Sequence, residues 1–368
     1  MEKARIYRAR KNELYVIEKR PSLQETYQEK VYNSLYIRSF AQPLKNVVDL
    51  AKVLLCSYLI ICKLKVRPSF VYAYNQDPEN VIVAYSAKLI LRVPMVILYH
   101  HISQRSLSDI RVGIKNRRAS GYSLVSSVWR SLVPWINYKC AKRADVHLSL
   151  SKATADEVKE VLGVTKCEVI GNGVDTNRFK EMALEKIYEA AFLGRIVPQK
   201  GIDVLLRAWS LVVKTLPNAK LLLIGGADRQ KLKDYEVMVK SLGLTGSVTF
   251  TGFVDDELLV RLLNQSKLFV FPSRREGFAQ AVSQAMACGL CCILSDLPSL
   301  REVYADAAVY FPPEDYEELS RLITLYLRDD LARLTFGKKA KERVRGMLWD
   351  EVVEREISAI SSFRRQPI

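Results

Sequence analysis

Glycine is absent from the first 112 residues of this 368-residue chain, and the first one is Gly113. No glycine-rich loop can therefore lie in this stretch. Long apolar runs are absent as well: the nearest candidate, residues 47–62, is interrupted by Asp49 and Lys52 and falls short of the ~18 apolar residues of a membrane span. We interpret it as a buried amphipathic helix. The charged stretch at residues 2–10 lacks the apolar core of a secretion signal.

Cysteine is sparse and odd in number. The seven cysteines are scattered, which fits a reducing cytoplasm and excludes a disulfide scaffold. Hydrophobic residues make up 49% of the chain, which excludes an intrinsically disordered protein. At roughly 100–200 residues per domain, the length predicts about two domains, each with its own core. We therefore expect a cytoplasmic protein.

Acidic residues are scarce in one half only. Residues 1–180 contain 30 Lys and Arg against 15 Asp and Glu, a net charge of +15, whereas residues 181–368 contain 26 against 25. A basic half beside a neutral one predicts an anionic partner, either a membrane surface or a phosphorylated acceptor. Nucleic acid would also fit the charge, but no nucleic-acid-binding motif accompanies it, and we expect no nucleic acid to bind.

Apolar runs of strand length alternate with amphipathic segments of helix length. In the second half, expected strands end at residues 193, 224, 250, 271 and 294, and a helical segment follows each of the first four. This rhythm predicts an α/β protein with two Rossmann-like, doubly wound domains facing each other across a cleft. We expect the domains at residues 1–178 and 186–344, with a helix at about 345–362 packing back on the first. Ligands should bind at the carboxyl ends of the strands.

Two of these strand ends carry residues that suit a phosphorylated sugar. Residues 194–201 offer two glycines, Arg195, Lys200 and backbone N–H groups at a strand-to-helix junction, which suits a diphosphate. Glu276 precedes the next helix, where it is placed to accept hydrogen bonds from sugar hydroxyls. Gln284 lies eight residues on, about 12 Å along the axis of a continuous helix. The alternatives are a solvated loop, a helix-capping Glu and a surface Gln.

The second half resembles the C-terminal nucleotide-binding domain of the retaining glycosyltransferases of family 4, the GT-B group called glycosyl transferase group 1. The matching motifs, in the family's order and spacing, are LGRIVPQKG (residues 193–201), LLIGG (222–226), FTGFV (250–254), PSRREGF (272–278) and SDLPSLRE (295–302). Motifs of the first half match too, at residues 99–100, 142–145, 149–152 and 171–179. The resemblance covers roughly residues 65–360, and so many ordered motifs are very rare by chance.

The resemblance implies a nucleotide-diphosphate sugar as donor and transfer with retention at the anomeric carbon. By matching position, Arg195 and Lys200 would neutralise the departing diphosphate, Glu276 would hold the donor sugar, and His100 would contact the sugar or phosphate near the scissile bond. No Asp-x-Asp motif occurs, so we expect neither a metal nor another cofactor. The other substrate-binding positions that the resemblance implies are Gly194, Gly225, Val254, Gly277, Phe278, Ala279 and Gln284.

Three departures from the family pattern bear on activity. Gln284 replaces a carboxylate that accepts from both ribose hydroxyls, at a cost of about 1–3 kcal/mol of nucleotide binding. Ala279 replaces a glycine, which predicts a longer phosphate contact. The family's opening strand and glycine-rich loop have no counterpart, since residues 13–18 resemble its second strand. We expect this first strand either to be encoded before Met1 or to be missing from a reduced domain.

Some signals have competing interpretations. Cys288 and Cys291 have the spacing of a redox or zinc pair, but no second pair accompanies them, and we expect a structural role. His147 lies in an apolar run and should be a satisfied core histidine, and His101 should be a loop residue. Residues 105–118 are basic and precede an apolar stretch with two Trp at 122–135. That combination fits a peripheral membrane contact, and the alternative is a solvated loop before a core-facing helix.

We therefore predict a hexosyltransferase that acts on a lipid-linked or anionic glycan precursor at the inner face of the membrane. The alternative is a catalytically weakened paralogue that binds nucleotide sugar and serves as the partner of an active transferase. Gln284 and the missing glycine-rich loop favour this alternative.

Overall fold

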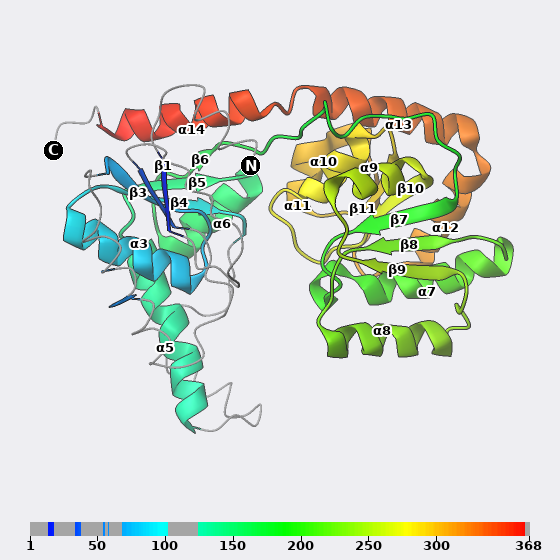
Figure 1. Cartoon of the computed structure of the whole chain (residues 1–368), viewed down its shortest axis with the longest axis horizontal. Coiled ribbons are helices and arrows are strands. Elements are labelled where there is room, and N and C mark those ends of the chain that lie inside the picture. Colours follow the sequence, from blue (N-terminus) through cyan, green and yellow to red (C-terminus); the bar gives the residue numbers. More distant parts are fainter. Residues whose placement is uncertain are drawn as a thin grey trace. The chain divides into compact units, whose positions relative to one another are not determined.

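The computed structural model describes residues 14–17, 34–37, 54–55, 58, 68–101 and 124–364. Contacts between Cα atoms divide the chain into two compact units. The first consists of Met1–Gly171 together with Asp350–Ile368, and the second of Asn172–Trp349. The C-terminal helix therefore belongs to the same unit as the beginning of the chain (Figure 1).

The first unit contains a parallel sheet whose strands are paired in chain order. Its strands are β1 (Leu14–Ile17), β2 (Ser34–Ile37), β3 (Phe70–Ala73), β4 (Met95–Tyr99), β5 (Val146–Ser149) and β6 (Glu168–Val169). Its longer helices are α3 (Pro78–Leu91), α5 (Leu124–Ala141), α6 (Lys152–Leu162) and α14 (Trp349–Arg364). The region before β1, where no strand was expected, lies outside the described residues. Most of the helix expected at residues 47–62 also lies outside them.

The second unit is the more regular of the two. Its parallel strands are β7 (Tyr188–Leu193), β8 (Leu221–Ile224), β9 (Val248–Gly252), β10 (Ser266–Phe271), β11 (Cys291–Ser295) and β12 (Val309–Phe311). Its helices are α7 (Ile202–Thr215), α8 (Arg229–Ser241), α9 (Asp256–Asn264), α10 (Gln280–Ala287), α11 (Pro298–Tyr304), α12 (Tyr316–Arg328) and α13 (Asp330–Arg345).

Burial explains why these strands form a parallel sheet. Every residue of β8 and β11 is buried, as expected for strands that helices cover on both faces. Helix α7 packs on α12, and α10 packs on α13, so that helical layers enclose the sheet (Figure 1). Phe192 and Phe271 stack at 5.8 Å between ring centroids in this core, which joins β7 to β10.

The strand order of the second unit reverses at its centre. The order is β12-β11-β10-β7-β8-β9, so β7 has β8 on one side and β10 on the other. The connections after β7 and β10 run in opposite directions, and in parallel sheets ligands bind at the carboxyl ends of the strands at such a point. The fold therefore directs attention to the loops after Leu193 and Phe271.

The predicted α/β class with two parallel-sheet domains is confirmed. The helix expected after the strand that ends at residue 271 begins at Gln280, because Ala279 has a left-handed backbone (φ 63°, ψ 69°) that no α-helix continues through. In the part of the chain that the structure describes, no helix combines the length and the apolar character that crossing a bilayer demands.

Candidate active site

The loop after β7 is held against the neighbouring strand by backbone hydrogen bonds. The N–H of Gly194 donates to the Ile224 carbonyl, and that of Ile196 donates to the Gly226 carbonyl, each at 2.9 Å. A short 3-10 turn at Pro198–Lys200 follows and ends at Gly201, whose φ of +67° turns the chain into α7. This arrangement presents Lys200 at the carboxyl end of the sheet.

Gly201 allows the loops after β7 and β10 to touch. A Cβ at this position would lie 1.9 Å from the carbonyl oxygen of Pro272, which no side chain can tolerate. Further along, the Arg274 N–H donates to the Gln199 carbonyl at 2.9 Å. The two loops are therefore in direct backbone contact at the point where the strand order reverses.

Lys200 and Glu276 meet across this contact. The Lys200 Nζ forms an ion pair with Glu276 Oε1, and the Ser273 Oγ donates to the same oxygen at 2.6 Å. The side chains are 19% and 11% exposed, so both charges are largely shielded from water. An ammonium has three donors and a carboxylate two oxygens, so the pair can also bind hydroxyl or phosphate oxygens. Two predicted site residues are thus brought together.

The backbone after Glu276 is fixed by two side chains from α11. The Ser299 Oγ donates to the Glu276 carbonyl at 2.6 Å. The Tyr304 Oη lies 2.8 Å from the carbonyls of both Phe278 and Ala279, and burial raises the pKa of this phenol well above its usual value. Because Tyr304 stays protonated and in place, the peptide groups of 277–279 are held rigidly before α10 begins.

Ala279 adopts the left-handed conformation that favours glycine. The turn into α10 is therefore kept, although the residue is not a glycine. The longer phosphate contact expected from this substitution stays a prediction.

The remaining predicted positions of this unit lie around the same sheet edge. Gly225 has φ +135°, and a Cβ on it would lie 2.0 Å from the Gly194 carbonyl, so the ends of β7 and β8 are in close contact. The Gly225 N–H donates to the Gly252 carbonyl, two residues before the half-buried Val254. Arg195 is exposed on its loop.

Gln284 is half-buried in α10. The rise of 12 Å expected for a continuous helix from Glu276 does not apply, because the chain between them is helical only from Gln280.

His100 belongs to the first unit, at the end of β4. Its N–H donates to Gln76 Oε1 at 3.2 Å, and its Nε2 lies 3.1 Å from the Tyr74 carbonyl. A carbonyl only accepts, so Nε2 carries the proton. The Gln76 Nε2 also lies 3.3 Å from Nδ1 of His101. His101 is thus a loop residue beside His100, as predicted.

Several of these contacts were not anticipated from the sequence. Ser273 and Ser299 lie inside motifs that the resemblance singled out, but nothing in the motifs assigns them a role. Tyr304 comes 28 positions after Glu276 and carries no local signal, because its role depends on where α11 packs. Gln76 follows a buried strand, and this position is the one feature of the sequence that would have indicated Gln76 as a site residue.

The competing interpretations of other residues are settled by burial. Cys288 and Cys291 are buried, and burial raises the pKa of each thiol to about 12, so both stay protonated and unreactive. His147 is 7% exposed, stacks on Tyr99 and lies 3.1 Å from its hydroxyl, which confirms the core histidine. Among the residues with described positions, no three His, Cys, Asp or Glu side chains gather as metal ligands.

The basic segment at 105–118 lies outside the described residues. The apolar stretch after it forms α5, which packs on α3.

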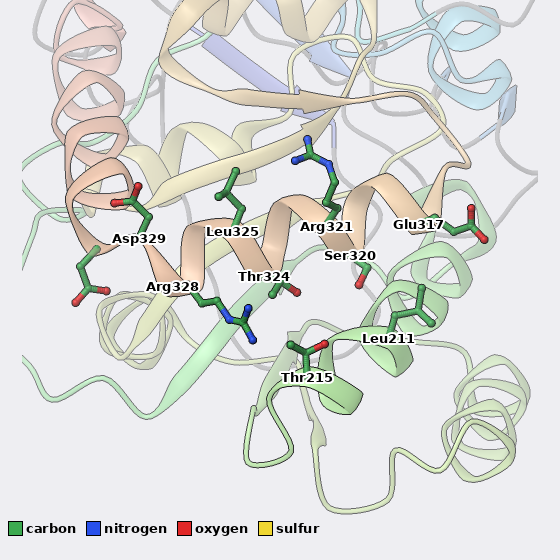
Figure 2. A pocket seen from close by; sticks show the side chains of 10 residues that line it. Leu211, Thr215, Glu317, Ser320, Arg321, Thr324, Leu325, Arg328 and Asp329 are labelled. Atoms are coloured by element: carbon green, nitrogen blue, oxygen red, sulfur yellow. The ribbon is translucent and has the colours of Figure 1, made fainter.

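A groove of about 800 Å³ lies elsewhere on the second unit, between α7 and α12 (Figure 2). Exposed side chains such as Arg321, Leu325 and Arg328 line it, and it shares no residue with the loops after β7 and β10.

Two family models match the chain. "Glycosyltransferase Family 4" matches residues 4–178, and "Glycosyl transferases group 1" matches residues 173–343. Among curated proteins, the chain is 31% identical to the phosphatidyl-myo-inositol mannosyltransferase of Mycolicibacterium smegmatis, over 52% of this chain and 51% of that protein. It is 30% identical to the serotype-specific mannosyltransferase WbdA of Escherichia coli, over 51% of this chain and 25% of that protein. The chain thus spans about a quarter to a half of the length of these relatives.

Solved structures share the fold. The sucrose-phosphate synthase of Thermosynechococcus elongatus superposes with a TM-score of 0.70 at 20% identity, covering 90% of this chain and 88% of that one. Anabaena HepE, in complex with UDP and glucose, superposes with a TM-score of 0.66 at 20% identity, covering 89% and 85%. At this identity the likeness shows the two-domain architecture alone.

Proposed function

Because the chain belongs to the glycosyltransferases of family 4 and group 1, we propose that it transfers a hexose from a nucleotide-diphosphate sugar to an acceptor. The observation that carries this proposal is the contact of Lys200 with Glu276, held in place by Ser273, at the strand-order reversal of the second unit. A fixed cation and a fixed carboxylate at one point suit a ligand that has a phosphate beside a sugar.

The roles in this proposal follow from charge. As the bond between the sugar and the diphosphate breaks, negative charge grows on the departing phosphate, and Lys200 and Arg195 stabilise it. Glu276 accepts hydrogen bonds from the sugar hydroxyls and orients the anomeric carbon. The N–H groups around Gly277 and Ala279, at the start of α10, add partial positive charge near the phosphate. These cations can supply what a divalent metal supplies in other transferases, so we expect the reaction to proceed without a metal. Retention at the anomeric carbon is what the resemblance to the family implies.

The role of His100 near the scissile bond is implied by the resemblance alone and stays an expectation. Its Nε2 proton is engaged by the Tyr74 carbonyl, which fixes the plane of the imidazole ring. The name of the mycobacterial relative supports a lipid-linked acceptor, and the charge of +15 on residues 1–180 supports an anionic one.

The second candidate function is that of a weakened paralogue, and Gln284 favours it. The residue lies in α10 with a neutral amide where the family has a carboxylate, so ribose binding has one acceptor oxygen fewer. A paralogue of this kind would bind nucleotide sugar through Lys200 and Glu276 but form no product.

Labelled nucleotide sugars with a lipid-extract acceptor test both candidates. Wild-type protein should bind a nucleotide sugar and form labelled product, whereas Lys200→Ala and Glu276→Ala should lower turnover by about 10²-fold or more. Lys231→Ala, which breaks an exposed ion pair with Asp234 on α8, is the matched control and should leave turnover unchanged. EDTA should also leave turnover unchanged.

Binding without product would favour the weakened paralogue. Wild-type turnover in Lys200→Ala and Glu276→Ala would refute the donor site. Loss of activity in EDTA that Mg²⁺ or Mn²⁺ restores would refute the metal-independent mechanism.

A further inference from the structure

Arg274 makes an unusual set of contacts two residues before Glu276. Its guanidinium donates two hydrogen bonds to Asp203, at 2.8 and 2.7 Å, and two to Glu314, at 2.6 and 2.7 Å. It also donates to the Pro198 carbonyl. The planar guanidinium is therefore shared between two carboxylates and a backbone oxygen, a geometry that an ammonium cannot reproduce.

The partners of Arg274 surround Lys200 in the sequence. Pro198 and Asp203 lie two residues before and three residues after Lys200, at the turn and in the first turn of α7. The backbone N–H of Arg274 donates to the carbonyl of Gln199, the residue directly before the lysine. The loop that carries Lys200 is thus attached to Arg274 on both sides of the lysine.

Asp203 and Glu314 connect this loop to two other parts of the unit. Asp203 lies in the first turn of α7, and Glu314 lies just before α12. Burial raises the pKa of Asp203, but the hydrogen bonds and charge of Arg274 outweigh it, so the pKa lies below its usual value. Asp203 therefore stays charged, and its contact with Arg274 persists at neutral pH. Bidentate contacts to two carboxylates also distinguish this network from ordinary surface ion pairs.

Donor binding acts on the Lys200–Glu276 pair and leaves the contacts of Arg274 in place. When sugar hydroxyls bind Glu276 and a phosphate binds Lys200, the direct link between the two side chains weakens. No partner of Arg274 is one of the residues assigned to the donor, so its contacts remain. Together with the hydrogen bond from the Ser273 hydroxyl to the Gln199 carbonyl, they then hold the two loops at a constant spacing.

We propose that Arg274 is a positioning residue that clamps the loop after β7 to the loop after β10, and so keeps Lys200 and Glu276 in register while the donor is bound. This inference rests on the proposed function and adds a residue to the same site. It predicts that loss of Arg274 misplaces Lys200 without removing it.

Arg274→Gln and Arg274→Lys test the inference, with Arg321→Gln as the matched control. Arg321 makes the same bidentate contact to a carboxylate, that of Glu318, but within α12. In Arg274→Gln, kcat for transfer should fall by ~10-fold or more, since a misplacement of about 1 Å can cost 10²-fold. Arg274→Lys keeps the positive charge but loses the planar set of donors of the guanidinium, so it should recover only part of kcat. Arg321→Gln should match wild type.

A double-mutant cycle separates positioning from a structural role. In the Arg321→Gln background, Lys200→Ala should lower kcat by the same factor as in wild type. In the Arg274→Gln background it should lower kcat by a smaller factor, because the lysine is already misplaced there. Equal factors in both backgrounds would overturn the inference, as would a kcat of Arg274→Gln equal to that of the control. If Arg274→Gln does not fold, Arg274→Lys enters the same cycle. A wild-type protein without nucleotide-sugar binding would overturn the proposed function together with this inference.

Discussion

Ala279 holds a backbone conformation that disfavours every residue with a Cβ. Its φ of +63° places it in the left-handed region, which costs an L-residue about 1–2 kcal/mol. Ala279→Gly should therefore raise the free energy of unfolding, by ~0.5–1 kcal/mol after the greater freedom of glycine in the unfolded chain is subtracted. Urea denaturation of the two proteins measures the difference.

Ala281→Gly is the control for this substitution. It changes the same residue type two positions on, inside α10, where the backbone is already helical and glycine gives no relief. We expect its free energy of unfolding not to exceed that of wild type. A free energy of unfolding below that of wild type in both variants would contradict the assignment of strain to Ala279.

His147 makes stability depend on pH in a predictable direction. Burial lowers the pKa of this histidine from its usual 6.5 to about 4. Below pH 6.5 the unfolded chain therefore binds a proton that the folded chain rejects until about pH 4, so the free energy of unfolding falls as pH falls through this window. A difference of this size corresponds to at most ~3 kcal/mol.

His147→Gln tests this origin because glutamine does not titrate. We expect the stability difference between wild type and variant to change between pH 7 and pH 4 and then level off, as measured by denaturation at each pH. A difference that stays constant across this range would show that other groups cause the pH dependence.

The contact between the loops after β7 and β10 depends on one glycine. In Gly201→Ala the new Cβ would meet the Pro272 carbonyl at 1.9 Å, and the φ of +67° adds a left-handed penalty. We expect the free energy of unfolding to fall by ~2 kcal/mol or more and nucleotide-sugar binding to be lost, because the loops separate and Lys200 moves away from Glu276.

Gly243→Ala isolates the steric part of this effect. Gly243 has nearly the same φ, +69°, but a Cβ there would meet no atom within 4 Å. The free energy of unfolding of this control should fall by only ~1 kcal/mol, the cost of the left-handed conformation, and the control should bind nucleotide sugar normally. Equal losses of stability and binding in the two variants would refute the close-approach role of Gly201.

The charge of the whole molecule predicts where it acts. If the net charge of +15 on residues 1–180 serves a membrane, anionic vesicles should bind the protein strongly at low salt. Binding should weaken as the Debye length shrinks from about 30 Å at 0.01 M to about 3 Å at 1 M, and neutral vesicles should bind little. Vesicle co-sedimentation over a salt series measures this dependence.

Two fourfold variants locate the membrane contact. The first replaces by Ser the residues Arg111, Lys115, Arg117 and Arg118, each of which contributes about 1 kcal/mol near an anionic surface, and should release the protein while nucleotide-sugar affinity stays unchanged. The second replaces by Ser four exposed lysines of the near-neutral half, Lys214, Lys231, Lys233 and Lys240. It should bind vesicles like wild type. Equal binding by all three proteins would mean that the basic half serves a soluble partner.

The amino-acid sequence determined the elements of the second unit and the identity of its charged loop residues. In the first unit, helix α6 likewise occupies Lys152–Leu162 because Ser151 caps its start and Gly163 ends it. Strands and helices of this kind follow from hydrophobic periodicity and capping, which are local properties. The same local patterns placed Lys200 and Glu276 in loops after strands.

Only the tertiary structure decided which of these loops meet. Lys200 contacts Glu276, 76 positions away, because β7 pairs with β10, and Arg274 reaches Asp203 across 71 positions for the same reason. Strand order is set by how the whole unit buries its apolar surface. Because this depends on many contacts between distant residues, no single segment of the sequence predicts it. The sequence therefore named the charged residues of the site, whereas the clamp at Arg274 and the support from Tyr304 exist only in the folded unit.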